Sequence, residues 1–381
     1  MQLLMMWLHS MMSSSGILSI DLPAIQSNWH YVASTLAVNT ECAAVVKANA
    51  YGVGATQVVG ALYQRGCRNF FVVTLDEALD LRKILPSDAS LFVLGGLKEG
   101  SESLFIDFDL TPVLYSLRAI SRWLDFCDTQ NVSIPCALKL DTGMTRLGMS
   151  LDDLDHFFKE IVHRRSLNPV LFMSHLACAD ERAHPLNNLQ LTRFKNAASK
   201  IKAYFPNIKL SLANSSGVFL GSEYHFDMVR IGAALYGINP QRDQVNPLSS
   251  TIYLKLPVLQ IRELGVPVSV GYGAVGQAGA GSRLAVVAGG YADGIHRTLG
   301  LEPIGQIEGV EVSAIGRVSM DSCVFDISSS PNAFPNYIDV INSNLTLDSL
   351  IAKNKSLGYE VLTSLGSRYK REYLPIGPNH D

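Results

Sequence analysis

A single lysine, Lys47, stands where a short apolar run meets a polar turn. Residues 43–54 read AAVVKANAYGVG, so Lys47 follows four apolar residues and precedes Tyr51 and two glycines. A lysine amine can form a Schiff base with a carbonyl compound when its surroundings keep part of the amine uncharged. A lone lysine at the end of a strand is more often a solvated charge, so other residues must decide between these two interpretations.

Further polar residues follow other short apolar runs. Each has a simple structural interpretation: a core histidine, a capping turn before a helix, or a glycine needed only for close packing. Their joint occurrence after successive runs favours a shared site instead. The residues concerned are Lys139 and Arg146 in CALKLDTGMTR, His175 in VLFMSH, Asn214 and Ser215 in LANSSG, and Arg230, Gly232 and Ala233 in VRIGAA.

The elements that must position these residues alternate between apolar runs and amphipathic segments, a pattern typical of parallel strands with helical crossovers. Eight strands with crossovers in about 200 residues predict a closed (β/α)8 barrel of the TIM type, in which chemistry gathers at the C-terminal ends of the strands. The predicted strands are AAVV (43–46), FFVVT (70–74), LFVL (91–94), TPVLY (111–115), PCALKL (135–140), VLFMS (170–174), KLSLA (209–213) and DMVRI (227–231).

The assembled residue types suit pyridoxal phosphate, an anionic cofactor with a reactive carbonyl. Lys47 could form the Schiff base and His175 could stack on a heteroaromatic ring. Hydroxyls and oriented N–H groups suit phosphate oxygens, and these could come from Tyr51, Ser215 and the backbone around Gly232 and Ala233. The chain has no G-x-G-x-x-G opening a helix after a strand and no G-x-x-x-x-G-K-[ST], the motifs of rival nucleotide cofactors.

After residue 240 the pattern of apolar and polar residues changes. QRDQVNPLSS is polar and contains proline, and short β-like runs punctuated by Gly and Pro follow it. We therefore expect a weakly ordered tail at 1–15, the barrel at 16–242, and a smaller, mostly β domain at 243–381. This last domain should also contain one helix at TLDSLIAKNKS and a strand near YEVLTSL.

Composition limits the possible functions. Charged residues make up 17% of the 381 residues and the net charge is −3 without a long basic run, which gives nucleic-acid binding little support. The six cysteines lack metal-like spacing and predict buried thiols in a reducing cytoplasm. No apolar run is long enough for a membrane span. Asp293 and His296 alone make a weak metal signal, so no metal is expected.

In these motifs the chain closely resembles the alanine racemases, which are fold-type III pyridoxal phosphate enzymes. VKANAYGVG resembles the lysine motif of that family, and KLDTGMTRLGM resembles its second-lysine and arginine motif. Coverage runs from about residue 17 to the end. The remaining motifs, in the order of the family, are SHLACAD, LANSSG, VRIGAALYG, VGYGA, GGYADG and GRVSMD.

The resemblance implies a two-base racemisation of L-alanine and D-alanine that supplies D-alanine for peptidoglycan. Lys47 would hold the cofactor and serve one face of the substrate Cα, and Tyr272 would serve the other. One base removes the α-proton and the second returns a proton from the opposite side. In the family this tyrosine reaches the site across a dimer interface, so a homodimer with shared sites is expected.

The resemblance assigns further roles residue by residue. Arg230 would hydrogen-bond the pyridine nitrogen, Arg146 would contact the substrate carboxylate, and Lys139 would carry a carbamate that positions Arg146. The chain departs from the family pattern at Val53, where histidine is common, and at Ser367, where some members have a phosphate-binding tyrosine. In the second domain, Met320 and Asp321 would approach the substrate from the partner chain, and Tyr291 would line the entrance to the site.

Three other functions are compatible with parts of this pattern. A non-catalytic barrel protein that carries pyridoxal phosphate would keep Lys47 but lack the β domain with VGYGA and GRVSMD. A barrel decarboxylase would remove a carboxylate instead of a proton. The arrangement of Arg230 with a tyrosine base favours racemisation over this reaction. A serine racemase or a racemase of broader specificity on the same scaffold remains an alternative within the racemase interpretation.

Overall fold

The computed structural model describes residues 15–295, 304–354 and 357–375, and the chain divides into two compact units. One unit is Ile25–Ser249, and the other combines residues 15–24 with the described residues from Ser250 on. The change between them falls inside the polar segment 241–250. The boundaries differ from the expected 16–242 and 243–381 because residues 17–21 pair with late strands. The tail expected at 1–15 lies outside the described residues, apart from Ser15.

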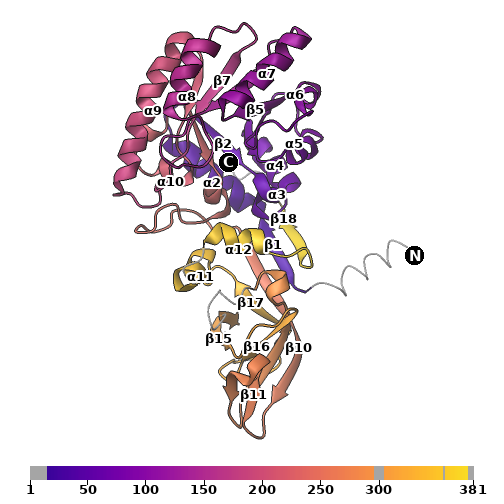
Figure 1. Cartoon of the computed structure of the whole chain (residues 1–381). Coiled ribbons are helices and arrows are strands. Elements are labelled where there is room, and N and C mark those ends of the chain that lie inside the picture. Colours follow the sequence, from indigo (N-terminus) through magenta and orange to yellow (C-terminus); the bar gives the residue numbers. More distant parts are fainter. Residues whose placement is uncertain (1–14, 296–303, 355–356, 376–381) are drawn as a thin grey trace, which may run out of the picture. The chain divides into compact units, whose positions relative to one another are not determined.

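The first unit is the predicted barrel. Eight parallel strands follow one another in the order β8-β7-β6-β5-β4-β3-β2-β9, and the backbone N–H of Arg230 donates to Ala213 at 3.0 Å, which brings the last two strands together. The ring is therefore nearly closed (Figure 1). The strands are β2 (Glu41–Val45), β3 (Asn69–Val72), β4 (Ser90–Val93), β5 (Leu110–Leu114), β6 (Pro135–Lys139), β7 (Asn168–Met173), β8 (Lys209–Ser211) and β9 (Met228–Ile231).

Helices lie outside this ring of strands (Figure 1). Local signals set several of their starts: Ser116 accepts a hydrogen bond from Ala119 N, and Pro185 occupies the first turn of the longest helix. The helices are α2 (Leu22–Thr35), α3 (Lys47–Tyr51), α4 (Ala55–Gln64), α5 (Leu75–Arg82), α6 (Glu102–Asp107), α7 (Leu117–Gln130), α8 (Leu151–His156), α9 (Pro185–Tyr204) and α10 (Ser215–Val218), with one π-helical turn, η1 (Phe157–Ile161), and two 3-10 turns, η2 (Ser222–Tyr224) and η3 (Ala233–Tyr236).

Alternate residues of the strands fill the barrel interior, because successive side chains of a strand point to opposite faces. Small and large side chains interlock there, and Phe71 stacks on Phe92 with ring centroids 4.5 Å apart. This packing closes the interior beneath the C-terminal strand ends. The buried interior residues are Ala43, Val45, Phe71, Phe92, Val113, Ala137, Leu171, Met173 and Met228.

The second unit is the expected β domain, and part of its sheet closes into a six-strand ring through the pairing of β10 with β13. The strand β1 (Ile17–Asp21) pairs antiparallel with β10 and parallel with β18, so indigo β1 lies beside yellow β18 in Figure 1. The other strands are β10 (Ile252–Glu263), β11 (Val268–Val270), β12 (Gly276–Ala278), β13 (Arg283–Ala288), β14 (Ile304–Ile307), β15 (Val310–Ala314), β16 (Ser322–Asp326), β17 (Tyr337–Ile341) and β18 (Lys370–Leu374).

Two helices also belong to this unit. The predicted helix is present as α11 (Leu347–Asn354), whereas the strand expected near YEVLTSL is wrong, because these residues form α12 (Gly358–Ser364). Val361 and Leu362 are the buried side chains of α12. In so short an apolar run, the sequence pattern does not distinguish a helix from a strand. The described residues of this unit also form two 3-10 turns, η4 (Tyr272–Ala274) and η5 (Tyr291–Asp293).

Two further observations bear on the composition. None of the helices in the described ranges is long and apolar enough to cross a membrane. All six cysteines are free thiols, and all except Cys178 are buried.

Candidate active site

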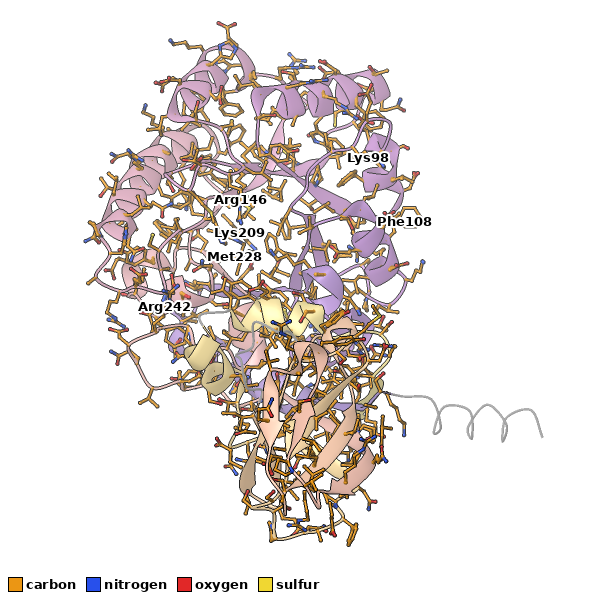
Figure 2. The ribbon with its side chains drawn as sticks, turned by 60° about the horizontal axis from the view of Figure 1, so that its bottom comes forward. Lys98, Phe108, Arg146, Lys209, Met228 and Arg242 are labelled. Atoms are coloured by element: carbon orange, nitrogen blue, oxygen red, sulfur yellow. The ribbon has the colours of Figure 1, made fainter. Side chains whose placement is uncertain are left out.

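Four of the predicted site residues lie at the C-terminal ends of barrel strands. Each continues the row of side chains on its strand that faces the barrel interior. Each stands two residues beyond a buried interior side chain, so strand periodicity directs both to the same face. In Figure 2 Arg146 and Met228 are both labelled over the interior of the barrel. The pairs of core and site residue are Val45 and Lys47, Ala137 and Lys139, Met173 and His175, and Met228 and Arg230.

The backbone after Lys47 has an unusual conformation. Ala48, Asn49, Ala50 and Tyr51 all have left-handed dihedrals, with φ between 52° and 56°. A left-handed turn costs about 1–2 kcal/mol per non-glycine residue, so the structure around it must hold it in place. Glu77 Oε1 accepts a hydrogen bond from Ala48 N at 2.6 Å, and Asn49 Oδ1 accepts one from Ala55 N at 2.8 Å.

The two lysines lie in an environment that opposes their charge. Burial, followed by the charge of Arg146, lowers the pKa of Lys47, and Glu77 partly offsets this effect. Lys139 is 6% exposed, and burial together with the nearby cations lowers its pKa to about 8. Both amines therefore lose their protons more easily than a lysine in water.

Arg230 and His175 form the floor of the site. Arg230 donates to Ser174 O at 2.6 Å, to His175 Nδ1 at 3.4 Å and to the hydroxyl of Ser211. Burial lowers the pKa of Arg230 to about 9, which leaves the guanidinium charged near neutral pH. Burial, followed by the charges of Arg230 and Arg146, lowers the pKa of His175 well below its usual value, so its imidazole is neutral.

Arg146 lies on a loop that returns to the strand from which it left. Asp141 N donates to Met149 O and Met149 N donates to Lys139 O, both at 2.8 Å. The carboxylate of Asp141 accepts hydrogen bonds from Gly143 N and Met144 N within the same loop. These bonds hold exposed Arg146 at the same end of the barrel as Lys139, whose pKa it affects.

A candidate anion site is built from residues of three loops. Ser215 Oγ accepts hydrogen bonds from Gly232 N at 2.9 Å and Ala234 N at 3.2 Å, which leaves its own proton available for donation. Asn214 caps α10 by accepting from Gly217 N at 2.9 Å, as the capping interpretation predicted. Ala233 begins the adjoining turn η3.

Gly232 permits a close approach of Tyr51 at this candidate anion site. A methyl group at this position would overlap the hydroxyl of Tyr51 and lie 3.0 Å from its Cζ. The absence of a side chain therefore brings the Tyr51 hydroxyl next to the backbone at Gly232 and Ser215. Tyr51 also packs on Tyr236, with ring centroids 4.9 Å apart.

Tyr272 belongs to the β unit and occupies the tip of the β11–β12 hairpin. Gly271 and Gly273 on either side have φ of 75° and 71°, values that favour glycine, and they turn the chain sharply around the tyrosine. The side chain is 69% exposed. A large aromatic presented at a hairpin tip is suited to contact another molecule or subunit.

The loops that carry Tyr291, Met320 and Asp321 are joined to one another. Tyr291 N donates to Ser319 O at 3.0 Å, and Gly289 N donates to Asp321 O at 2.9 Å. Tyr291, Met320 and Asp321 all have exposed side chains.

An arginine absent from the sequence analysis connects these two loops. Arg368 donates from Nε and Nη2 to the carboxylate of Asp293, each at 2.7 Å, and from Nη1 to Asp321 at 2.6 Å. Asp293 is fully buried, and its carboxylate also accepts from Gly290 N at 3.0 Å. Asp293 thus has a structural role, whereas His296 lies outside the described residues. No group of three or more metal-ligating side chains occurs in the part of the chain described.

The two departures from the family pattern also have structural consequences. Val53 is fully buried and packs as a core residue instead of presenting a polar group. Tyr369, two residues after Ser367, is 3% exposed, and burial raises the pKa of its hydroxyl. Tyr369 is therefore a core side chain of the β unit and does not replace the phosphate-binding tyrosine that some members have where Ser367 stands.

The residues of the barrel fit pyridoxal phosphate by their chemistry. The hydroxyls of Tyr51 and Ser215 meet beside Gly232, where a side chain would overlap the hydroxyl of Tyr51. Lys47 supplies an amine of lowered pKa. Arg230 supplies a fixed cationic donor at the floor, beside a neutral imidazole.

Sequence reasoning missed Glu77 as well as Arg368. A local signal was available for Glu77, because T-L-D-E directly after a predicted strand is the signature of a capping box. The structure contains that box, with Glu77 N donating to Thr74 Oγ1 at 3.2 Å. The pairing of Arg368 with Asp293 spans 75 residues and has no local signature.

Comparison with known proteins agrees with this architecture. Residues 20–240 match the family model of the alanine racemase N-terminal domain, and residues 251–373 match that of the alanine racemase C-terminal domain. An alanine racemase of Rhodospirillum rubrum is 45% identical over 363 residues, which are 94% of this chain and 96% of the relative.

Solved structures give the same result. The crystal structure of alanine racemase from Bartonella henselae with covalently bound pyridoxal phosphate has a TM-score of 0.89 at 36% identity, covering 95% of this chain and all of that one. The biosynthetic alanine racemase from Pseudomonas aeruginosa has a TM-score of 0.85 at 32% identity, with 95% of this chain and 100% of that chain covered.

The barrel, the lysine at the end of its first strand and the attached β domain together define a barrel enzyme that uses pyridoxal phosphate. Both domains and the relatives then specify the family. The chain belongs to the alanine racemase family.

Proposed function

We propose that this protein interconverts L-alanine and D-alanine with pyridoxal phosphate, using Lys47 and Tyr272 as the two proton-transfer groups. The observation that carries the proposal is the convergence of Lys47, Lys139, His175 and Arg230 at one end of the barrel, in a chain that matches both domain models of the family. The β domain with its exposed Tyr272 favours a racemase over a non-catalytic barrel protein.

Lys47 would hold the cofactor through its amine and move a proton at one face of the substrate Cα. Its lowered pKa supports this role, because only the neutral amine can bond to a carbonyl carbon or accept a proton. When bound, pyridoxal phosphate withdraws electrons and so stabilises negative charge at the Cα from which the proton leaves.

The other barrel residues would bind and orient the cofactor. Arg230 would donate to the ring nitrogen and, since it remains charged, keep that nitrogen free of a proton, which limits competing reactions. Neutral His175 would pack on the ring. The phosphate would be bound by the hydroxyls of Tyr51 and Ser215 and by the backbone at Gly232 and Ala233, with Gly232 N turning to the phosphate from Ser215 Oγ, to which it donates in this structure. Asn214 would fix the turn that carries Ser215.

Tyr272 would serve the second face of the substrate as part of a homodimer with shared sites. Its exposure at a hairpin tip supports this arrangement, because a catalytic phenol must be shielded from bulk water by something beyond its own hairpin. Tyr291, Met320 and Asp321 share that exposure and would reach the substrate in the same way. Arg146 would bind the carboxylate of the substrate.

Lys139 would react with carbon dioxide to form a carbamate, with release of one proton from the amine. The pKa of about 8 supports this reaction, because a useful fraction of the amine is neutral under physiological conditions. The product carries a negative charge where the lysine carried a positive one, so it would attract Arg146 instead of repelling it.

We further propose that the enzyme acts in the cytoplasm and supplies D-alanine for peptidoglycan. Six free thiols fit a reducing compartment, and the similar Pseudomonas aeruginosa structure is described as biosynthetic. Racemisation of serine or of a wider set of amino acids is the alternative.

The test is racemisation of L-alanine in deuterated water by the purified protein with pyridoxal phosphate. D-alanine carrying deuterium at Cα is expected, since two bases exchange protons with solvent. Borohydride reduction should fix the cofactor at Lys47 in the same preparation. Labelling of another lysine, or activity on serine well above that on alanine, would contradict the corresponding part of the proposal.

A further inference from the structure

Glu77 lies outside the set of residues assigned above, yet it contacts the turn that starts at Lys47. Its Oε1 accepts from Ala48 N at 2.6 Å, and its Oε2 accepts from Val73 N at 2.8 Å and Thr74 N at 3.1 Å. Both oxygens are therefore engaged, by donors from two different segments. Hydrogen bonds to a charged acceptor are stronger than neutral ones, so this carboxylate is firmly located.

The two segments are the ends of adjacent strands. Ala48 follows β2 and Lys47, whereas Val73 and Thr74 follow β3, which pairs in parallel with β2. Glu77 thus ties the exit of one strand to the exit of the next. The bond to Ala48 falls on the first residue of the left-handed turn and fixes the backbone immediately after Lys47.

The charges around the Lys47 amine give Glu77 a second effect. Arg146 and Lys139 repel the protonated amine, and the nearby imidazole of His175 is neutral. Glu77 carries the opposite charge and raises the pKa of Lys47 against these cations and against burial. Loss of this carboxylate would leave the amine among positive groups.

We propose that Glu77 is a positioning residue for Lys47, which fixes the backbone of the left-handed turn and supplies the negative charge that balances the cations at the amine. The role of Lys47 in racemisation rests on the function proposed above, but the structural claim about Glu77 does not. Substitution of Glu77 should therefore alter the chemistry of Lys47 even when no cofactor is bound.

The decisive variant is Glu77→Gln, which has nearly the same shape but no charge and can accept on one side only. Asp76→Asn is the matched control, because Asp76 is an exposed carboxylate in the same first turn of α5. Thr74→Ala removes the hydroxyl that accepts Glu77 N while keeping the carboxylate, and so separates helix capping from the contact with Ala48.

The primary measurement is the rate of acetylation of Lys47 as a function of pH in the cofactor-free protein, followed by peptide mass spectrometry. In Glu77→Gln the midpoint should move to lower pH, whereas Asp76→Asn should retain the wild-type midpoint. Thr74→Ala should lower Tm without moving the midpoint. A Glu77→Gln midpoint equal to that of the control, or an equal displacement in Thr74→Ala, would overturn the proposal.

Catalysis gives the second measurement. In the holoenzyme, kcat/KM of Glu77→Gln should fall about 10²-fold, as expected for a misplaced catalytic group. Glu77→Asp keeps the charge but shortens the reach to Ala48, so it should retain the Lys47 midpoint and still lose kcat/KM. If Glu77→Gln does not fold, Glu77→Asp alone tests the positioning role. A wild-type kcat/KM in Glu77→Asp would overturn that role. Labelling requires neither cofactor nor alanine, so a protein without racemase activity can still confirm or refute the role of Glu77.

Discussion

The hydroxyl of Tyr51 lies directly against the backbone at Gly232, so close that a methyl group there would overlap it. The two residues are far apart in the sequence, one after the first barrel strand and the other after the last. Ser215 lies beside this contact, because its Oγ accepts a hydrogen bond from Gly232 N. The proposed phosphate site therefore depends on the absence of a side chain at a single position.

Gly232→Ala should weaken pyridoxal phosphate binding about 10- to 100-fold, because the added methyl group displaces Tyr51 or the loop and overpacking costs about 1–3 kcal/mol. The affinity is measured by titration of the cofactor-free protein. Gly60→Ala is the matched control, since a methyl group there meets open space in the middle of α4 and should stabilise the helix. Equal cofactor affinity in the two variants would contradict the proposed phosphate site.

Lys139 should make stability depend on pH. Its pKa is lowered to about 8 in the folded protein from an ordinary 10.5, so below pH 8 the protonated amine lowers the free energy of unfolding by about 3 kcal/mol. Between pH 8 and pH 10.5 the unfolded chain holds a proton on Lys139 that the folded chain has released, so the free energy of unfolding rises with pH. In buffer free of carbon dioxide, Lys139→Met should raise stability at pH 7 and flatten this rise, as measured by urea unfolding. Lys195→Met, at an exposed lysine of α9, should do neither.

Carbamate formation at Lys139 can be observed directly. Addition of 13C-labelled bicarbonate should produce a carbamate resonance in the NMR spectrum, and its intensity should grow as pH rises through about 8 because the neutral amine is the reactant. The resonance should vanish in Lys139→Met. A spectrum without this resonance in the active wild-type enzyme would exclude the modification.

Tyr272→Phe should leave cofactor binding unchanged and lower kcat about 10²- to 10⁴-fold, the range expected for loss of a general acid or base. With Lys47 still in place, exchange of the α-proton of one enantiomer should be affected more than that of the other. Proton exchange of each enantiomer in deuterated water measures this difference. Tyr337→Phe, at a half-exposed tyrosine on β17, serves as the control. An equal effect on both enantiomers would argue against Tyr272 as one of two bases.

Shared sites make a quantitative prediction for mixed dimers. When Lys47→Ala and Tyr272→Phe chains are mixed equally and exchange at random, about a quarter of the sites should contain both native residues. Activity should recover to about that fraction, with exchange followed by differently tagged chains. Exchange without recovery would place both residues of each site in one chain.

The eight barrel strands were predicted correctly because each is a short apolar run, and the registers of those runs fix which residues face inward. Lys47, Lys139, His175 and Arg230 could therefore be selected from strand ends alone. Local patterns did not reveal that β1 joins the β domain, because its partners β10 and β18 lie more than 200 residues away along the chain. The short run in α12 was misread because its buried residues suit either a helix or a strand.

Local residue patterns were enough to predict the barrel, the presence of a β domain, the cofactor class and the polar residues at the strand ends, because each of these follows from short runs of sequence. Tertiary structure alone decided how those residues behave. The neutral imidazole of His175 and the lowered pKa of Lys139 result from burial among cations supplied by other strands. The carboxylate of Glu77 reaches the turn after Lys47 only because two neighbouring strands end side by side.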